Sequence, residues 1–420
     1  MQNPGECKFY LKASDHIFIY VLTTEEVYFM KKLCVVMCFV LVFASFGIFA
    51  SAENESMMPI DVKAKSAILM DQTTGRVLMK MNENKKLYPA SVTKIMSMLL
   101  IAEAIDSNTI RLTDEVTTST EASKKGGSQI WLKEGEVMTV EELLKATAVY
   151  SANDACTALG EYIAGSDEGF VTMMNERAAE LGMKNTHFDN CTGLDDTSET
   201  HLTTAYDIAL MSRELMKHTF ILQYTKIWMD SLRDGKTELV NTNKLIRFYE
   251  GATGLKTGTT SKAGCCISAT ATRDGTSLIA VVMGADNSKD RFEGAKAMLN
   301  WGFANYETVT PQIDKSLITD VNIVMGEERT VTPQISGNAK FLIPKGKAKD
   351  LKQEIDLAAA VEAPVESNQT LGTVTVTLDG QKLGEYKLTS SHYVERLSFK
   401  TVFIRMICSI CKEKQGVSVN

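Results

Sequence analysis

The sequence has few of the residues on which several enzyme chemistries depend. It contains five histidines and no H-E-x-x-H motif, so zinc-dependent hydrolysis is poorly supported and no metal site is expected. It has no G-x-S-x-G turn, which presents the nucleophile in many Ser-His-Asp hydrolases. Nine cysteines in 420 residues are too few for a disulfide scaffold.

The chain also lacks a strong excess of one charge. Its formal net charge of -7 gives no general attraction for a polyanion, so nucleic acid is not an expected partner. Hydrophobic residues make up 44% and charged residues 23% of the chain, which are ordinary globular values. A chain of 420 residues exceeds one comfortable hydrophobic core, so we expect two domains.

The first long apolar run has the order of a secretory signal. Two lysines after Met30 lead into the apolar run, which ends in the small-x-small pattern A-S-A before polar residues. This order predicts a signal peptide over residues 30–52, with a short membrane anchor as the alternative. Residues 1–29 precede a complete signal, so we interpret them as a mis-assigned N-terminal extension. Either interpretation of the run predicts export to the outer face of the cytoplasmic membrane.

The cysteines beyond this signal are interpreted as packing residues. Cys265 and Cys266 are neighbours in a predicted strand, where successive side chains point to opposite faces. Cys408 and Cys411 form a C-x-x-C motif with no second Cys or His pair nearby. That isolation argues against a zinc site and leaves the role of the motif open.

Strand and helix signals divide the exported chain into a first domain over residues 57–310 and a small all-β domain over 311–389. In the first domain, residues 67–79 and 265–283 each predict a β-hairpin, the second around an Asp-Gly turn. The apolar residues that follow Ser91 lie nearly all round a helix, which predicts a central helix buried on every side.

Capping signals place two more helices in the first domain. Thr139 and Glu142 form a capping box, and Asp154 is expected to cap a helix that ends near residue 165. A short loop over residues 151–153 lies between these helices. In the second domain, short Val/Ile/Thr runs predict strands, and residues 358–364 are expected to form a loop.

The last segment, residues 390–414, predicts a basic amphipathic helix. Apolar residues from Phe399 to Ile410 recur at helical spacing, and lysines and arginines lie elsewhere around the helix. This pattern is typical of a helix that lies on an anionic membrane surface. The alternative is a helix that packs on its own domain.

Three short motifs occur in order along the chain, and each alone is weak. They are S-x-x-K at Ser91 and Lys94, S-x-N at Ser151 and Asn153, and K-T-G at residues 256–258. A second S-x-x-K lies at residues 409–412 and a second S-x-N at 336–338, which shows that chance produces such triplets. Order and predicted context favour the first set.

The first motif has the geometry that an activated serine needs. Residues three apart on a helix face the same way, so the Lys94 amine can reach the Ser91 hydroxyl. A lysine serves as the base only when it is neutral, and burial or a second cation lowers its pKa. Lys256 is the candidate second cation, and the helix N-terminus offers backbone N–H groups for an oxyanion.

The other two motifs have plainer alternatives. Ser151 and Asn153 could relay a proton and hold a peptide, or could only terminate helices. Lys256 lies among glycines that permit a peptide to add as an extra strand, or it could be a solvated lysine on an edge strand.

This set resembles the penicillin-binding proteins and serine β-lactamases, and more closely the D-alanyl-D-alanine carboxypeptidases of the peptidase S11 type. The longer blocks that carry the resemblance are A-I-L-M-D at 67–71, P-A-S-V-T-K at 89–94, S-A-N-D-A at 151–155, G-L-K-T-G-T-T at 254–260 and W-G-F at 301–303. Ala152 stands where many relatives have glycine. The resemblance implies an α+β fold, in which helices flank an antiparallel sheet, with a second, small all-β domain.

The resemblance also implies the roles of the residues. Ser91 would be the acylated nucleophile and Lys94 its base, with Ser151 and Asn153 as the second motif. Lys256, Thr257 and Gly258 would bind substrate, and the N–H groups of Ser91 and Thr259 would form the oxyanion hole. Arg291 would lie near the substrate carboxylate, although a surface salt bridge is the alternative. The implied partners are a peptidoglycan pentapeptide and, as covalent inhibitors, β-lactam antibiotics, with no cofactor.

Two other functions remain open on the sequence. A serine β-lactamase would use a glutamate to activate the deacylating water, and Glu199 with Thr203 faintly resembles that motif. However, residues 204–209 resemble the carboxypeptidases. A non-catalytic cell-wall binding protein of the same fold is the second alternative, and the presence of every reactive residue argues against it.

Overall fold

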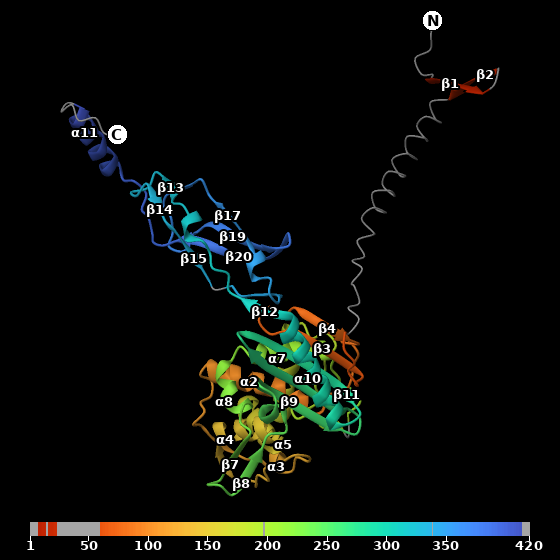
Figure 1. Ribbon diagram of the computed structural model, residues 1–420. Coiled ribbons are helices and arrows are strands. Elements are labelled where there is room, and N and C mark those ends of the chain that lie inside the picture. The colour runs from red at the N-terminus through yellow and green to blue at the C-terminus, as the bar shows by residue number, and fades with distance from the viewer. Residues whose placement is uncertain (1–6, 14–15, 23–58, 196–197, 338, 414–420) are drawn as a thin grey trace. The chain divides into compact units, whose positions relative to one another are not determined.

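The computed structural model describes residues 7–13, 16–22, 59–195, 198–337 and 339–413 (Figure 1). The chain divides into two units, residues 1–55 and 56–420. In the first unit, β1 (Cys7–Ala13) and β2 (His16–Leu22) pair as an antiparallel hairpin. The predicted signal peptide, residues 30–52, lies outside the described residues.

A five-stranded antiparallel sheet forms the centre of the first domain. Its order is β4-β3-β11-β10-β9, which leaves β9 at one edge. The strands are β3 (Ser66–Asp71), β4 (Val77–Met81), β9 (Ala252–Thr260), β10 (Gly264–Arg273) and β11 (Thr276–Ala285). Both predicted hairpins are present, and the turn between β10 and β11 has positive φ at Asp274 and Gly275, as its twist requires.

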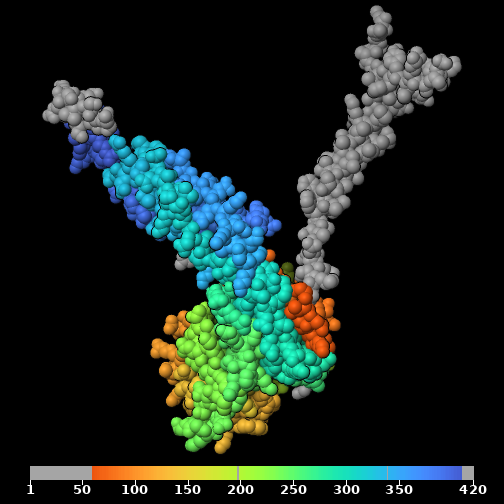
Figure 2. Space-filling model, in the orientation of Figure 1, coloured from red at the N-terminus to blue at the C-terminus, as the bar shows by residue number. Residues whose placement is uncertain are grey.

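Both faces of this sheet are buried because helices cover each of them. Along β3, Ile68 and Met70 pack into one core cluster, whereas Ala67 and Leu69 pack into the other, as alternation along a strand requires. The first cluster contains α2 (Lys94–Asp106), and ten of its thirteen residues are buried, as predicted. The second contains α10 (Ser288–Asn305), which lies along the sheet (Figure 1). Figure 2 shows the outer surface of the molecule in the same orientation, coloured by residue number.

Shorter helices and hairpins complete the first domain. The predicted capping box is present, because Thr139 and Glu142 exchange hydrogen bonds at the start of α4. The helices are α3 (Thr120–Ser123), α4 (Val140–Lys145), the π-helical η2 (Ala146–Tyr150), α5 (Asn153–Ala164), α6 (Asp167–Glu180), α7 (Ala205–Leu215), the 3-10 turn η3 (Thr219–Ile221), α8 (Leu222–Thr225) and α9 (Leu245–Phe248). Two hairpins pair β5 (Glu115–Thr117) with β6 (Val137–Thr139), and β7 (Met229–Leu232) with β8 (Thr237–Val240).

Asp154 does not cap α5, and that expectation was wrong. Ala152 occupies the N-cap position, without a side-chain hydrogen bond. The Asp154 carboxylate instead accepts the backbone N–H groups of Ile130, at 3.2 Å, and Leu132, at 3.0 Å. Asp154 therefore stabilises the loop around residue 131. Helix-end signals in the sequence do not reveal such a contact.

In its described residues, the second domain contains strands and short turns, followed by a terminal helix. In a four-stranded sheet, β15 (Pro333–Ser336), β20 (Gln381–Ser390), β19 (Thr370–Leu378) and β17 (Lys352–Leu357) lie in that order. A smaller sheet joins β14 (Thr330–Val331), β13 (Val321–Val324) and β18 (Ala360–Glu362), and β12 (Tyr306–Val309) pairs with β16 (Phe341–Pro344). Two 3-10 turns, η4 (Lys315–Leu317) and η5 (Ala348–Asp350), connect these strands.

Two details of the second domain differ from the sequence expectations. The predicted loop over 358–364 contains β18, which pairs in parallel with β13, so a distant partner makes this segment a strand. Strand pairing begins at Tyr306, before the predicted boundary at 311, and Val394, after the boundary at 389, is buried in the core of this domain. The predicted fold class is confirmed: an α+β domain with an antiparallel sheet between helices, and a small all-β domain.

The predicted terminal helix is present as α11 (Phe399–Glu413). Most of its described apolar side chains are exposed, among them Phe399 (85%), Met406 (53%) and Ile404 (49%). A hydrogen bond from Arg405 Nη2 to the Glu327 carbonyl, 2.6 Å long, connects the helix to the second domain. No helix in the described part of the chain is both long enough and apolar enough to span a membrane.

Candidate active site

Ser91 and Lys94 lie on consecutive helical turns and contact each other as predicted. Ser91 belongs to a 3-10 turn, η1 (Ala90–Thr93), and Lys94 begins α2 directly after it. Lys94 Nζ donates a hydrogen bond to Ser91 Oγ at 3.1 Å. The i, i+3 spacing therefore brings the amine to the hydroxyl through a tight turn that precedes the α-helix.

The Lys94 amine is enclosed by protein. It donates to Asn153 Oδ1 at 2.5 Å and to the Thr192 carbonyl at 2.8 Å, and its side chain is fully buried. Burial lowers the pKa of Lys94 to about 8, against the smaller opposite effects of Cys156, Cys191 and Asp154. The amine can therefore gain or lose a proton close to neutral pH.

The second motif faces this amine. Asn153 is buried, and its Nδ2 donates to the Gly126 carbonyl at 2.6 Å while its Oδ1 accepts from Lys94. Ser151 ends η2 in the left-handed region at φ 67°, and its buried Oγ has no hydrogen-bond partner among the described residues. Ser151 therefore does end a helix through its backbone, but neither side chain caps one, so helix termination does not account for the Asn153 contact with Lys94.

Lys256 in β9 is buried, with 1% of its surface exposed, which excludes the solvated edge-strand alternative. Its amine donates to the Thr257 carbonyl at 3.0 Å. Burial, and then the charges of Lys94 and Arg291, lower the pKa of Lys256 well below its usual value. Lys256 was the candidate second cation that would lower the pKa of Lys94, but burial is the principal cause of the lowered pKa of both amines.

The third motif lies against the turn that holds Ser91. A Cβ added at Gly258 would lie 2.8 Å from both the Pro89 carbonyl oxygen and the Ser91 nitrogen, so only glycine fits this approach. Thr257 Oγ1 donates to Thr242 Oγ1 at 2.7 Å, and Thr259 Oγ1 donates to the Gly258 carbonyl at 2.8 Å. The edge strand and the serine turn thus form one continuous wall.

Arg291 reaches this strand from α10. Its Nη1 donates to the Gly258 carbonyl at 3.0 Å and to Thr259 Oγ1 at 2.8 Å. The residue is 8% exposed, and its guanidinium donates to carbonyl and hydroxyl oxygen atoms, so the surface salt-bridge alternative is wrong. Burial lowers the pKa of its guanidinium, which nevertheless remains a cation.

Comparison with known proteins agrees with this geometry. The family described as D-alanyl-D-alanine carboxypeptidase matches residues 51–287, and the penicillin-binding protein 5 C-terminal domain matches residues 306–396. The chain belongs to the D-alanyl-D-alanine carboxypeptidase family.

The relatives and solved structures of this family cover most of the chain. D-alanyl-D-alanine carboxypeptidase DacF of Bacillus subtilis is 41% identical over 361 residues, which cover 85% of this chain and 92% of the relative. Penicillin-binding protein 5 of Haemophilus influenzae is 30% identical with a TM-score of 0.70, over 81% of this chain and all of that one. Penicillin-binding protein D2 of Listeria monocytogenes, in its ampicillin-bound form, is 30% identical with a TM-score of 0.54, over 58% and 99% of the two chains.

The structure adds site residues of this carboxypeptidase that the motifs did not identify. The Thr192 carbonyl binds the Lys94 amine, and a Cβ at Gly193 would lie 1.9 Å from the Ala90 carbonyl oxygen. Asn190 holds this turn, because its Oδ1 accepts the N–H groups of both residues. The N-C-T-G sequence indicates a turn, but it contains no signal for what the turn contacts.

His201 is a second residue that the motifs missed. It is fully buried, its Nδ1 accepts the Asp189 N–H at 3.0 Å, and its Nε2 therefore carries the proton and donates to Thr93 Oγ1 at 2.8 Å. Burial lowers the pKa of His201 to about 4, which keeps the ring neutral near pH 7. His201 therefore supports the turn between the serine and the lysine as a hydrogen-bonding group without charge.

Glu199, the residue that faintly resembled a β-lactamase glutamate, lies at the surface. Its side chain is 83% exposed and pairs with Lys262 at 3.0 Å, and it accepts a hydrogen bond from the Tyr88 hydroxyl at 2.9 Å. None of its hydrogen bonds or ion pairs reaches Ser91 or Lys94. The β-lactamase alternative therefore loses the residue that suggested it.

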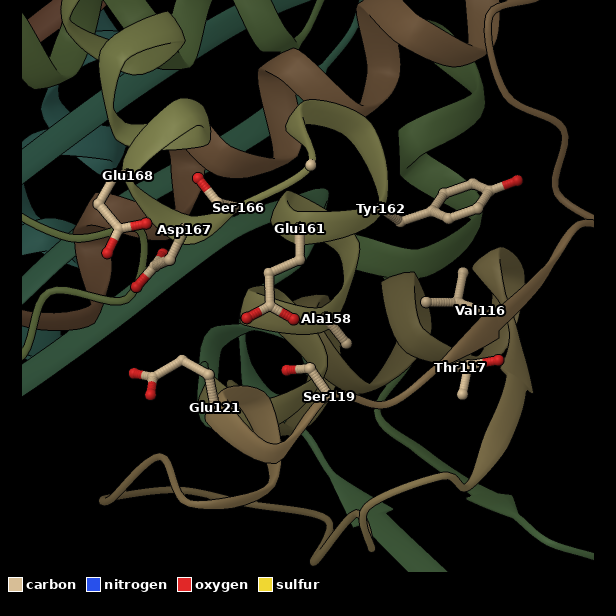
Figure 3. A pocket seen from close by; sticks show the side chains of 11 residues that line it. Val116, Thr117, Ser119, Glu121, Ala158, Glu161, Tyr162, Ser166, Asp167 and Glu168 are labelled. Carbon is tan, nitrogen blue, oxygen red and sulfur yellow. The ribbon is translucent and has the colours of Figure 1, made fainter.

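A hollow of about 410 Å³ elsewhere in the domain is acidic and is not part of this site. Figure 3 shows the carboxyl groups of Glu121, Glu161, Asp167 and Glu168 around it. Lys125 already pairs with Glu121 and Asp167, and no residue of the three motifs lines the hollow. Among the described residues, no cluster of three His, Cys, Asp or Glu side chains could hold a metal ion.

The close approach at Gly258 gives a direct test of the site geometry. Gly258→Ala should slow acylation by penicillin about 100-fold, because a displacement of about 1 Å at a reacting centre costs about that factor. Gly126→Ala is the matched control, since a Cβ there meets nothing within 4 Å and the carbonyl that binds Asn153 is kept. Stopped-flow or gel-based acylation rates measure both, and equal rates for the two variants would contradict the geometry.

Proposed function

We propose that this chain is a serine-type D-alanyl-D-alanine carboxypeptidase that uses Ser91 to remove the terminal D-alanine from peptidoglycan stem peptides. Its relatives bear that name, and the serine acyl-enzyme mechanism is general for the family. The observation that carries the residue assignment is the 3.1 Å contact between Ser91 Oγ and a buried amine whose pKa is about 8.

In the acylation step, the neutral Lys94 amine takes the Ser91 proton while Oγ attacks the carbonyl carbon between the two D-alanines. Lys94 has three hydrogen-bond partners, so the ammonium form is satisfied after it gains this proton. The C–N bond then breaks, and the leaving D-alanine amine receives a proton. The unpartnered, buried hydroxyl of Ser151 is suited to relay that proton between Lys94 and the leaving group.

Substrate binding uses the edge strand and the buried cations. A peptide can add to β9 as an extra strand, with its terminal carboxylate toward Lys256 and Arg291, which have no carboxylate ion pairs among the described residues. Thr257 and Thr259 offer hydroxyl groups on the same strand. The N–H groups of Ser91 and Thr259 are proposed as the oxyanion hole, and Asn153 as the residue that holds both Lys94 and the peptide.

Water then attacks the ester carbonyl, returns a proton to Ser91 and frees the shortened peptide. A β-lactam carries a strained amide and a carboxylate, so we expect it to acylate Ser91 in the same way and to remain attached longer. The non-catalytic alternative is disfavoured because nucleophile, base and both neighbouring motifs are in contact.

Replacement of the nucleophile should abolish the reaction. Ser91→Ala should release no measurable D-alanine from a peptide that ends in D-Ala-D-Ala, and mass spectrometry should find a penicillin adduct on the wild-type protein only. Ser97→Ala is a matched control, since this serine lies on α2, directly after the turn that holds Ser91, but donates to the Cys191 carbonyl. Unchanged D-alanine release by Ser91→Ala would refute the assignment.

The pKa of Lys94 predicts the pH dependence of acylation. Only the neutral amine accepts the serine proton, so the rate should rise with pH and level off above about pH 8. Two pH units below that pKa, only about one amine in a hundred is neutral, and the rate should be lower by about that factor. The second-order rate constant for penicillin acylation between pH 5.5 and 9.5 reports the free enzyme. A flat profile, or one that falls as pH rises toward 8, would show that Lys94 is not the base.

Export and membrane contact form a separate part of the proposal. The signal at residues 30–52 would carry the chain to the outer face of the cytoplasmic membrane. Helix α11 would then bind the membrane surface through its exposed apolar side chains, with Lys400 and Arg405 near anionic head groups.

Removal of this helix should release the protein from lipid. A chain that ends at Ser398 keeps Val394 in the second-domain core, so that domain should remain folded. We expect the full mature chain to sediment with vesicles that contain anionic phospholipid, and the shortened chain to remain in the supernatant at equal carboxypeptidase activity. Equal sedimentation of both chains would contradict a membrane role for α11.

A further inference from the structure

Trp131 is the most unusual exposed side chain of the first domain. Its side chain is 74% exposed, and its backbone has φ 61° in the left-handed region, where a bulky residue is strained. The other two tryptophans of the chain, Trp228 and Trp301, are partly buried and lie against aromatic rings. Trp131 has no such ring contact among the described residues, so its indole faces solvent in a conformation that packing alone does not explain.

The loop that carries Trp131 is fixed to the catalytic motif. Its neighbours Ile130 and Leu132 are buried and donate their N–H groups to the Asp154 carboxylate, at 3.2 and 3.0 Å. Three residues earlier, the Ser128 carbonyl accepts the Asn153 N–H at 2.7 Å. Because Ile130 and Leu132 are buried on either side of it, the Trp131 side chain points outward. The hydrogen bond to Ser128 ties the same loop to Asn153, which contacts Lys94.

Trp131 forms one wall of a hollow of about 650 Å³. The other walls carry polar groups, namely Lys133, Glu134, Arg233, Lys236 and Thr237. The Arg233 guanidinium donates to Glu136, at 2.6 Å, to the Ile130 carbonyl and to Thr237, and its Nη2 is buried without a partner among the described residues. The hollow therefore combines one open aromatic face with charged donors and acceptors of both signs.

We infer that this hollow binds a saccharide unit of the glycan to which the peptide substrate is attached. A pyranose ring presents C–H groups on one face, which suit an exposed indole, and hydroxyl and acetamido groups at its rim, which suit the ammonium, guanidinium and carboxylate groups. Apart from Ile130 and Trp131, the residues that line the hollow are polar or glycine, so it offers no apolar groove for a peptide. The inference rests on the proposed function, because it extends the same substrate from its peptide to its sugar.

The spacing along the chain agrees with this assignment. Trp131 is three positions from Ser128 along the chain, so their Cα atoms are at most about 11 Å apart. An extended pentapeptide spans about 17 Å, and its scissile bond lies at the end away from the sugar. A saccharide site within one peptide length of Asn153 can therefore be occupied while the terminal D-alanine is at Ser91.

The test compares one peptide with and without its N-acetylated disaccharide. In the full mature enzyme, Trp131→Ala should lower kcat/KM for the disaccharide-peptide about tenfold, which is the change that about 1.4 kcal/mol produces. The same variant should leave kcat/KM for the sugar-free peptide and the rate of penicillin acylation unchanged. Trp131→Phe should retain part of the preference. Lys236→Ala alters the lining outside the loop that carries Trp131 and should lower the same preference, so it keeps the test decisive if Trp131→Ala folds poorly. Met229→Ala, at another exposed apolar residue, is the control.

Each outcome decides the inference. A loss of kcat/KM that is equal for both substrates would assign Trp131 to positioning of the catalytic motif and overturn the saccharide site, as would no loss for either substrate. Calorimetry with the peptide-free N-acetylated disaccharide gives a readout that is independent of catalysis. The saccharide site is supported if the disaccharide binds the wild-type enzyme and binds Trp131→Ala more weakly. It is refuted if the disaccharide does not bind and the kinetics of the variant are unchanged. If wild type releases no D-alanine from either substrate, the proposed function fails, whereas the calorimetric result still decides the saccharide site.

Discussion

Lys94 places an amine where water does not reach and where no carboxylate pairs with it among the described residues. Burial disfavours the ammonium form, whereas Cys156, Cys191 and Asp154 favour it to a smaller extent. The balance of these effects holds the pKa near 8, where an amine can accept a proton and later return it. The central position of α2, between the sheet and the surrounding helices, is what keeps this amine dry.

The same constraint explains the electrostatics of the whole site. Lys94, Lys256 and Arg291 are all buried, and burial of an unpaired cation is costly. Backbone carbonyl oxygens, mainly those of Thr192, Thr257 and Gly258, compensate part of that cost without neutralising the charge. An anionic group that enters the site therefore meets a positive potential in a region of low dielectric constant, which is a basis for recognising the carboxylate of a peptide or of a β-lactam.

Much of the local structure could be predicted because short-range patterns specify it. The β10–β11 hairpin followed from its Asp-Gly turn, the start of α4 from Thr139 and Glu142, and the burial of α2 from its apolar residues on every side. Predictions failed where a distant partner decides the state of a segment. Asp154 fastens another loop, and residues 360–362 form a strand only because β13 lies beside them.

The pairing of Ser91 with Lys94 follows from their spacing, because residues three apart in a helical turn face the same way. The identity and order of the three motifs can also be read directly along the chain. In contrast, the other contacts of Lys94, with Asn153 and Thr192 at 59 and 98 residues along the chain, and the approach of Gly258 to the serine turn arise only when the chain is folded. Such contacts depend on how sheet and helices pack, and no periodicity or spacing along the chain encodes which carbonyl oxygen will face a buried amine.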